Sequence, residues 1–76
     1  MDRLFGLLAE VRPEVDFLCS QDFVADGLLD SFDVVMLVSA IERSCGVRID
    51  GAEIVPDNFR SLPALAALIR RHGGEP

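Results

Sequence analysis

The sequence predicts an all-α fold, a small four-helix bundle with three main helices and one short third helix. Three segments carry apolar residues at the spacing of one helical face. No segment shows the sustained alternation of apolar and polar residues that is typical of a β-strand. With 76 residues, 50% of them apolar, the chain is expected to form a single domain, residues 1–76, around one core.

The first helix is predicted over residues 2–11, where apolar residues recur at i, i+3, i+4 and i+7 (Leu4, Leu7, Leu8 and Val11). Pro13 ends it, because the residue before a proline is pushed out of the helical region. Residues 13–30 form a long loop without a clean period, and loops of this length are often functional. Its apolar residues are expected to anchor it in the core: Phe17, Leu18, Phe23, Val24, Leu28 and Leu29.

The second helix is predicted from Ser31 to about Cys45. Either Asp30 or Ser31 can cap it, since each side chain can accept a hydrogen bond from an exposed N–H of the first turn. Asp33 lies in that turn, where a carboxylate complements the helix dipole. Gly46 is placed to end the helix as its C-cap.

Two apolar stripes run along this second helix. One consists of Val34, Leu37, Val38, Ile41 and Cys45, and the other of Phe32, Val35, Met36 and Ser39. A helix in a small bundle needs one stripe for the core. Two alternatives follow: the helix is central and buries both stripes, or the second stripe is a docking surface in which Met36 supplies an adaptable contact.

The remaining chain is predicted to hold a short extended link over residues 47–49, a turn at Asp50-Gly51 and a short helical turn within residues 54–59, anchored by Phe59. Ser61 caps a last helix. Its face consists of Leu62, Leu65, Ala66 and Ile69, widened by Leu68, with Arg70 and Arg71 at its C-terminal end. Gly73-Gly74 ends this helix, and the last residues are expected to fray.

The net charge of −6 is concentrated in one part of the chain. Residues 13–42 contain no Lys or Arg and carry the acids Glu14, Asp16, Asp22, Asp26, Asp30, Asp33 and Glu42. This segment disfavours nucleic acid and anionic membranes as partners and favours basic proteins.

The sequence shows no secretory signal at Met1-Asp2-Arg3, and its apolar runs are too short to span a membrane. A cytoplasmic monomer is therefore expected. Cys19 and Cys45 are expected to be free thiols, because two isolated cysteines make a poor disulfide framework and the expected compartment is reducing.

Neither catalysis nor metal binding is favoured by the residue pattern. His72 is the only histidine, lies in the tail that is expected to fray, and is interpreted as a solvated residue. Ser31 has no general base placed by sequence to activate it, so we do not expect an enzyme. No zinc site is expected, since both cysteines are isolated.

Residues 22–33 partly match the twelve-residue EF-hand pattern through Asp22, Asp26, Asp30 and Asp33. The third position is Val24, where an oxygen ligand is needed. The twelfth position is Asp, which is shorter than the usual bidentate Glu. Calcium binding at this loop is therefore not favoured.

The segment Asp26-Gly27-Leu28-Leu29-Asp30-Ser31-Phe32-Asp33 carries a resemblance to a known family. With it, the chain resembles the acyl carrier protein superfamily, and within it the D-alanyl carrier and related stand-alone carriers. The similarity covers nearly the whole chain. It includes Asp16-Phe17 and Asp22-Phe23-Val24 in the loop, Gly46-Val47-Arg48-Ile49, and Asp57-Asn58-Phe59-Arg60-Ser61-Leu62 before the last helix.

The resemblance implies that Ser31 carries a 4′-phosphopantetheine arm from coenzyme A, attached by a phosphopantetheinyl transferase that Asp30 helps to recruit. The thiol of the arm would hold an acyl or aminoacyl group as a thioester. An adenylating ligase or acyltransferase would load it, and downstream biosynthetic enzymes would accept the cargo. The partner face would consist of Phe32, Asp33, Val35, Met36 and Ser39.

The identity of the cargo stays open among D-alanine, another amino acid, a fatty acyl chain and a polyketide unit. Val35-Met36 stands where many fatty-acid carriers have an acid, and the Leu28-Leu29-Asp30-Ser31-Phe32 motif favours an aminoacyl or short acyl load. The alternative function is a helical interaction module that is not a carrier and binds a partner through the acidic and apolar face of the second helix.

Overall fold

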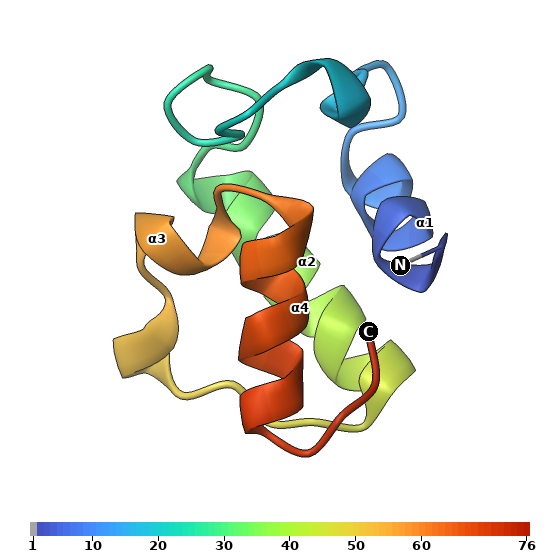
Figure 1. Cartoon of the computed structure of the whole chain (residues 1–76), viewed down its shortest axis with the longest axis vertical. Coiled ribbons are helices and arrows are strands. Elements are labelled where there is room, and N and C mark those ends of the chain that lie inside the picture. The colour runs from blue at the N-terminus through green and yellow to red at the C-terminus, as the bar shows by residue number, and fades with distance from the viewer. Residues whose placement is uncertain (1) are drawn as a thin grey trace.

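The computed structural model describes residues 2–76, and every regular element in that range is helical (Figure 1). The order is α1 (Asp2–Val11), a 3₁₀ turn η1 (Phe17–Cys19), α2 (Ser31–Cys45), a second 3₁₀ turn η2 (Gly51–Glu53), α3 (Pro56–Phe59) and α4 (Leu62–Arg71). The predicted all-α class, with three main helices and a short third one, is confirmed. Within residues 2–76, none of the helices is both long enough and apolar enough to cross a membrane.

The helices begin and end where local capping groups satisfy their terminal backbone. The Ser61 hydroxyl accepts the N–H of Ala64 at 3.2 Å and begins α4, as the sequence predicts. Gly46 ends α2 in the left-handed conformation, at φ 68° and ψ 25°, and its N–H donates to the carbonyl of Glu42 at 3.1 Å. A glycine adopts this conformation without the steric cost that a Cβ would add.

The core lies between α1, α2 and α4, and α3 packs onto α4 from the other side. The predicted faces of all three main helices point into it. Its most deeply buried side chains, with no measurable exposure, are Leu4, Leu8, Leu37, Ile41, Phe59, Leu65, Ala66, Leu68 and Ile69. Val34 and Cys45, at the two ends of the predicted core stripe of α2, are partly buried against this cluster.

The loop between α1 and α2 crosses one end of the bundle (Figure 1). Phe17 and Phe23 anchor it, with ring centroids 5.0 Å apart in an edge-to-face arrangement. Leu29 is also buried, whereas Leu18 is 71% exposed, so the prediction that Leu18 is an anchor was wrong. In a 3₁₀ turn successive side chains point about 120° apart, so burying Phe17 directs its neighbour outward.

The C-terminal tail packs back onto the bundle, and the expected fraying was wrong. The N–H of Gly74 donates to the carbonyl of Ile69 at 3.0 Å, and Arg3 Nη1 donates to the carbonyl of Glu75 at 3.0 Å. A Cβ at Gly74 would lie 2.6 Å from Val47 Cγ1, so only glycine allows the tail to approach this closely. These contacts bring the end of the chain beside α1 (Figure 1).

Candidate functional site

Ser31 is the first residue of α2, and its side chain is exposed. No group of residues 2–76 makes a hydrogen bond to its hydroxyl, and His72, the one imidazole, is bonded elsewhere. The side chain therefore stands free at the N-terminus of a 15-residue helix, where backbone N–H groups and the helix dipole favour a negative charge.

A capping box holds the backbone on both sides of Ser31. Asp30 Oδ1 accepts the N–H of Asp33 at 2.8 Å, and Asp33 Oδ2 accepts the N–H of Asp30 at 3.2 Å. Of the two capping residues that the sequence allowed, Asp30 is the cap. Because Asp30 performs this role, the Ser31 hydroxyl is not needed by the backbone and is left available for chemistry.

Asp33 is not on the partner face, which corrects the sequence-based prediction. Its residue is 6% exposed, and among the described residues it is the only buried charged one. Arg12, which directly follows α1, donates from Nη1 to Asp33 Oδ2 at 2.8 Å and from Nε to Glu14 Oε1 at 2.6 Å. The packing of α1 against α2 brings Arg12 to this carboxylate, and the pair links the end of α1 to the start of α2 beside Ser31.

The contacts within this cluster shift the pKa values of its three side chains toward their charged forms. Burial raises the pKa of Asp33, but the N–H of Asp30 and the guanidinium of Arg12 outweigh burial and leave it below its ordinary value. Hydrogen bonds to Glu14 and Asp33 raise the pKa of Arg12, and the bond from Arg12 lowers the pKa of Glu14. The negative charge of Asp33 is therefore balanced within the chain, and Asp30 is the exposed acid that adjoins Ser31.

The second apolar stripe of α2 is exposed to solvent. Phe32 is 69% exposed, Val35 60% and Met36 42%, and Ser39 is exposed as well. The alternative in which α2 buries both stripes is excluded. Phe32, Val35 and Met36 form an exposed apolar face next to Ser31, and that this face docks a partner stays a prediction.

An apolar hollow of about 300 Å³ adjoins Ser31, and the sequence did not predict it. We call it the hollow. Residues from three segments line it: Val24 and Leu29 from the loop, Asp30, Ser31, Val34 and Val35 from the start of α2, and Ile54, Val55, Pro56 and Phe59 from α3 and the residues before it. The only signal in the sequence was the apolar run Ile54-Val55-Pro56, which is too short to indicate a lining.

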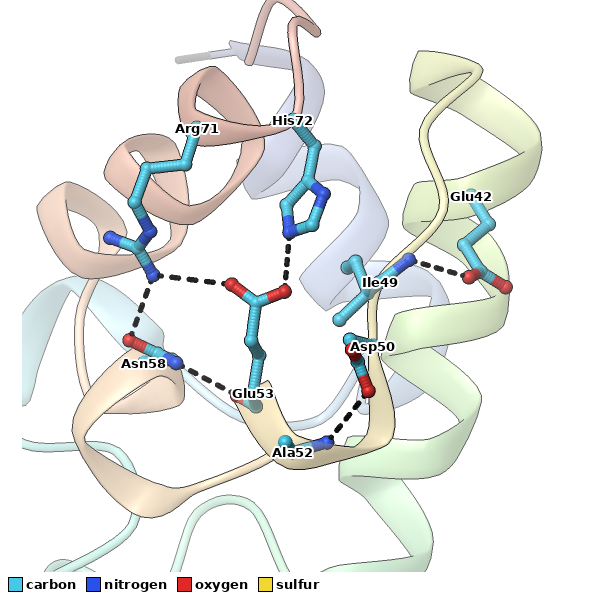
Figure 2. A network of polar contacts seen from close by, with 8 residues as sticks. All are labelled: Glu42, Ile49, Asp50, Ala52, Glu53, Asn58, Arg71 and His72. Atoms are coloured by element: carbon cyan, nitrogen blue, oxygen red, sulfur yellow. Dashed lines mark hydrogen bonds and ion pairs between the residues drawn. The ribbon is translucent and has the colours of Figure 1, made fainter.

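A second polar network joins the end of α4 to η2 and α3, and we call it the clasp (Figure 2). It consists of Glu53, Asn58, Arg71 and His72. His72 Nε2 lies 2.6 Å from Glu53 Oε1, and Arg71 Nη2 lies 3.9 Å from Glu53 Oε2 and 3.3 Å from Asn58 Oδ1. Asn58 Nδ2 donates to the carbonyl of Glu53 at 2.8 Å. The interpretation of His72 as a solvated tail residue was wrong, because the packed tail holds it against Glu53.

Acidic side chains of the loop between α1 and α2 accept hydrogen bonds that stabilise its turns. Asp22 Oδ1 accepts the N–H groups of Val24 and Ala25 at 3.1 and 2.9 Å, and Asp26 Oδ2 accepts the Ser20 hydroxyl at 2.5 Å. Within residues 2–76, no group of three or more His, Cys, Asp or Glu side chains is placed to hold a metal ion.

Both cysteines are free thiols, Cys19 exposed and Cys45 partly buried. A hydrogen bond to Asp16, with Sγ 3.1 Å from Oδ2, raises the pKa of Cys19. The raised pKa makes the Cys19 thiolate scarcer at neutral pH, so this thiol is not activated as a nucleophile.

No protein-family model, no curated protein and no solved structure matches this chain. The functional argument therefore starts from the residues around Ser31 and from their geometry.

Proposed function

We propose that this chain is a stand-alone carrier protein that holds an acyl or aminoacyl group on a 4′-phosphopantetheine arm at Ser31. A phosphopantetheinyl transferase would join the Ser31 oxygen to the phosphorus that bears the pantetheine part of coenzyme A. The bond from that phosphorus to the adenylate phosphate breaks, adenosine 3′,5′-bisphosphate leaves, and the serine proton goes to a base of the transferase. The chain itself catalyses no reaction and presents the thioester to other enzymes.

The observation that carries this proposal is the free hydroxyl of Ser31, exposed at the first position of α2. The capping box uses the side chains of Asp30 and Asp33, so modifying Ser31 costs the helix none of its capping bonds. The phosphodiester would sit beside the free N–H groups of the first turn, where an anion is favoured. A serine with these surroundings is suited to carrying a group and has no base with which to attack a substrate.

The exposed face beside Ser31 supports transient docking of several enzymes. Phe32, Val35 and Met36 would form the apolar centre of a small interface, with Ser39 at its edge. Asp30 stays exposed next to Ser31 and keeps the acidic character that attracts basic partners, including the transferase. The partners are the transferase, the ligase or acyltransferase that loads the arm, and the enzymes that accept the cargo. This role places the protein in the cytoplasm as a monomer.

The hollow supports a small cargo. Its lining is largely apolar and it adjoins the attachment residue, so it can shelter the apolar part of a loaded arm from water. A short acyl load suits an apolar hollow of about 300 Å³, and the Leu28-Leu29-Asp30-Ser31-Phe32 motif favours an aminoacyl or short acyl load from an adenylating ligase.

Arm attachment is tested by incubating the chain with coenzyme A and a promiscuous phosphopantetheinyl transferase, and measuring the intact mass. We expect a gain of one arm in the native sequence and none in Ser31→Ala. The matched control is Ser44→Ala, an exposed serine near the other end of the same helix and outside the proposed partner face, which is expected to be modified as fully as the native chain. No gain, or an equal gain in Ser31→Ala, would end the proposal.

The second candidate is an interaction module that does not carry an arm, and the exposed Phe32–Val35–Met36 face favours it. The two functions are separated by intact mass of protein purified from its native cell and by partner capture. Partner binding that is undiminished in Ser31→Ala, with no arm on the native protein, would support the module. An arm on the native protein would support the carrier.

A further inference from the structure

One wall of the hollow is formed by a segment with little secondary structure of its own to stabilise it. The segment runs over residues 51–59 and contributes Ile54, Val55, Pro56 and Phe59 to the lining. Its two helices are three and four residues long, and the N-cap of α3 makes no side-chain capping bond. Helices this short are not stable alone, so the position of the wall depends on its contacts with the rest of the molecule.

Two different contacts attach this wall to α4. Phe59, at its end, is fully buried in the core. The clasp holds the other part, because Glu53 and Asn58 lie on either side of Ile54, Val55 and Pro56 along the chain and both bond to the end of α4 (Figure 2). Glu53 is the centre of the clasp, since its carboxylate meets both His72 and Arg71 and its carbonyl meets Asn58.

The clasp is open to solvent on one side. The side chains of Glu53 and His72 are 28% and 23% exposed, and the Arg71 side chain is 51% exposed. Water therefore competes with these bonds and weakens them relative to a buried pair. A contact of this strength can open while the core stays folded, which is the property of a local unit with its own, lower stability.

We propose that Glu53 is a positioning residue that, through His72 and Arg71, fixes the wall at residues 51–58 and so sets how far the hollow opens. The occupant of the hollow, the group carried on Ser31, rests on the proposed function; the mechanical role of the clasp does not. Breaking the clasp would free Ile54, Val55 and Pro56 to move while Phe59 still holds the end of α3.

Amide hydrogen exchange of the unmodified chain tests this role. The reporting amides are those of Ile54, Val55 and Asn58, which donate to carbonyls within residues 51–55 at 3.2, 2.9 and 3.0 Å. In Glu53→Ala we expect their exchange to speed up about tenfold, the effect of losing one hydrogen bond to a charged group. Exchange in the core of α2, for example at Leu37 and Ile41, is expected to stay unchanged.

The matched control is Asp57→Ala, which removes a carboxylate from the same segment. Asp57 is 84% exposed in its side chain and pairs only with Arg60, at 3.4 Å, so it lies outside the clasp. We expect exchange at Ile54, Val55 and Asn58 to match the native chain. Glu53→Gln keeps an oxygen and a nitrogen at the same reach, so it is expected to restore most of the protection lost in Glu53→Ala.

The accessibility of the hollow is measured with 8-anilinonaphthalene-1-sulfonate, a dye whose fluorescence increases when it binds apolar surface. Its fluorescence is expected to rise severalfold in Glu53→Ala, well below the melting temperature, and to be unchanged in Asp57→Ala. The proposal is overturned by equal exchange in the two alanine variants, by acceleration spread evenly through α2 and α4, or by faster exchange without a change in dye binding. Because no arm is present, absence of arm attachment would remove the proposed function and leave this result standing.

Discussion

The two polar anchors of this small bundle differ in the burial of their carboxylate and in what they hold. Arg12 and Asp33 meet at 2.8 Å beside the start of α2, where the Asp33 side chain is 8% exposed and the Arg12 side chain is 33% exposed. The clasp holds η2 and α3 through side chains that are 23–51% exposed, and one of its ion contacts is 3.9 Å long. The first anchor belongs to a helix of 15 residues and the second to a helix of four.

Because of this difference, the start of α2 is held firmly beside Ser31, whereas the wall of the hollow is held weakly. The Arg12–Asp33 pair and the capping box fix the backbone on both sides of Ser31. The wall of the hollow is held by partly exposed contacts that water can replace. In the proposed carrier the first property serves recognition by the transferase and the second serves the cargo.

The largest expected effect comes from removing the apolar attachment that the clasp supplements. Phe59→Ala deletes a fully buried ring and should cost about 3–5 kcal/mol of unfolding free energy. That loss is a large share of the roughly 5–15 kcal/mol typical of a small domain, so we expect the melting temperature to fall by more than about 10 °C. Leu18→Ala, at a leucine that is 71% exposed, is the control and should melt like the native chain. Circular dichroism melts measure both, and a small loss in Phe59→Ala would mean that the wall is detached in solution.

The next prediction compares the stability contributed by the Arg12–Asp33 pair with that contributed by the clasp. Arg12→Gln removes the guanidinium that balances Asp33, so the pKa of that carboxyl rises relative to the native chain. We expect the melting temperature at neutral pH to fall by several degrees, more than in Glu53→Ala. The loss should shrink as the pH falls, because a protonated Asp33 no longer needs the cation. If the melting temperature falls equally in Arg12→Gln and Glu53→Ala, the greater burial of the Asp33 carboxylate does not strengthen its ion pair.

A smaller effect is the pH dependence of the native chain. The pKa of Asp33 is lowered in the folded protein, so its contribution to stability is present above the ordinary carboxyl value of 3.8 and disappears as the pH falls through the lowered pKa. Glu14, whose pKa is lowered by the same arginine, acts in the same direction. Melts taken from neutral pH down into this range should show the decline. Asp33→Asn should flatten it, and an unchanged decline in that variant would assign it to other carboxylates.

The smallest effect on stability is expected on the exposed face of α2. Met36 is 42% exposed, so Met36→Glu places a charge largely in water and should change the melting temperature by no more than a degree or two. The same change should weaken modification of Ser31 by the transferase, seen as a higher KM for the carrier with little change in kcat. Arg43→Glu, on the exposed surface near the other end of α2, is the control for charge and is expected to leave KM closer to the native value. A fall of many degrees in Met36→Glu would show that the methionine is part of the core.

Most of the fold was predictable, because it follows from local rules. Helical spacing and caps placed α1, α2 and α4 at the bounds that the structure shows, whereas the two apolar stripes of α2 left open whether the second one is buried, and the structure shows it exposed. The errors concern Leu18, Asp33, His72 and the C-terminal tail, which is packed rather than frayed. Asp33 and His72 were misjudged because their partners, Arg12 and Glu53, are 21 and 19 residues away along the chain.

The sequence by itself determined the all-α class, the helix ends and the position of Ser31 at the start of α2, since these depend on residues within a few positions of one another. Only the tertiary structure decided that Asp33 is paired internally, that the tail is packed, and that three segments enclose a hollow beside Ser31. The physical reason is distance along the chain. Spacing and capping act over one or two helical turns, whereas burial and ion pairing depend on which segments the packed core brings together.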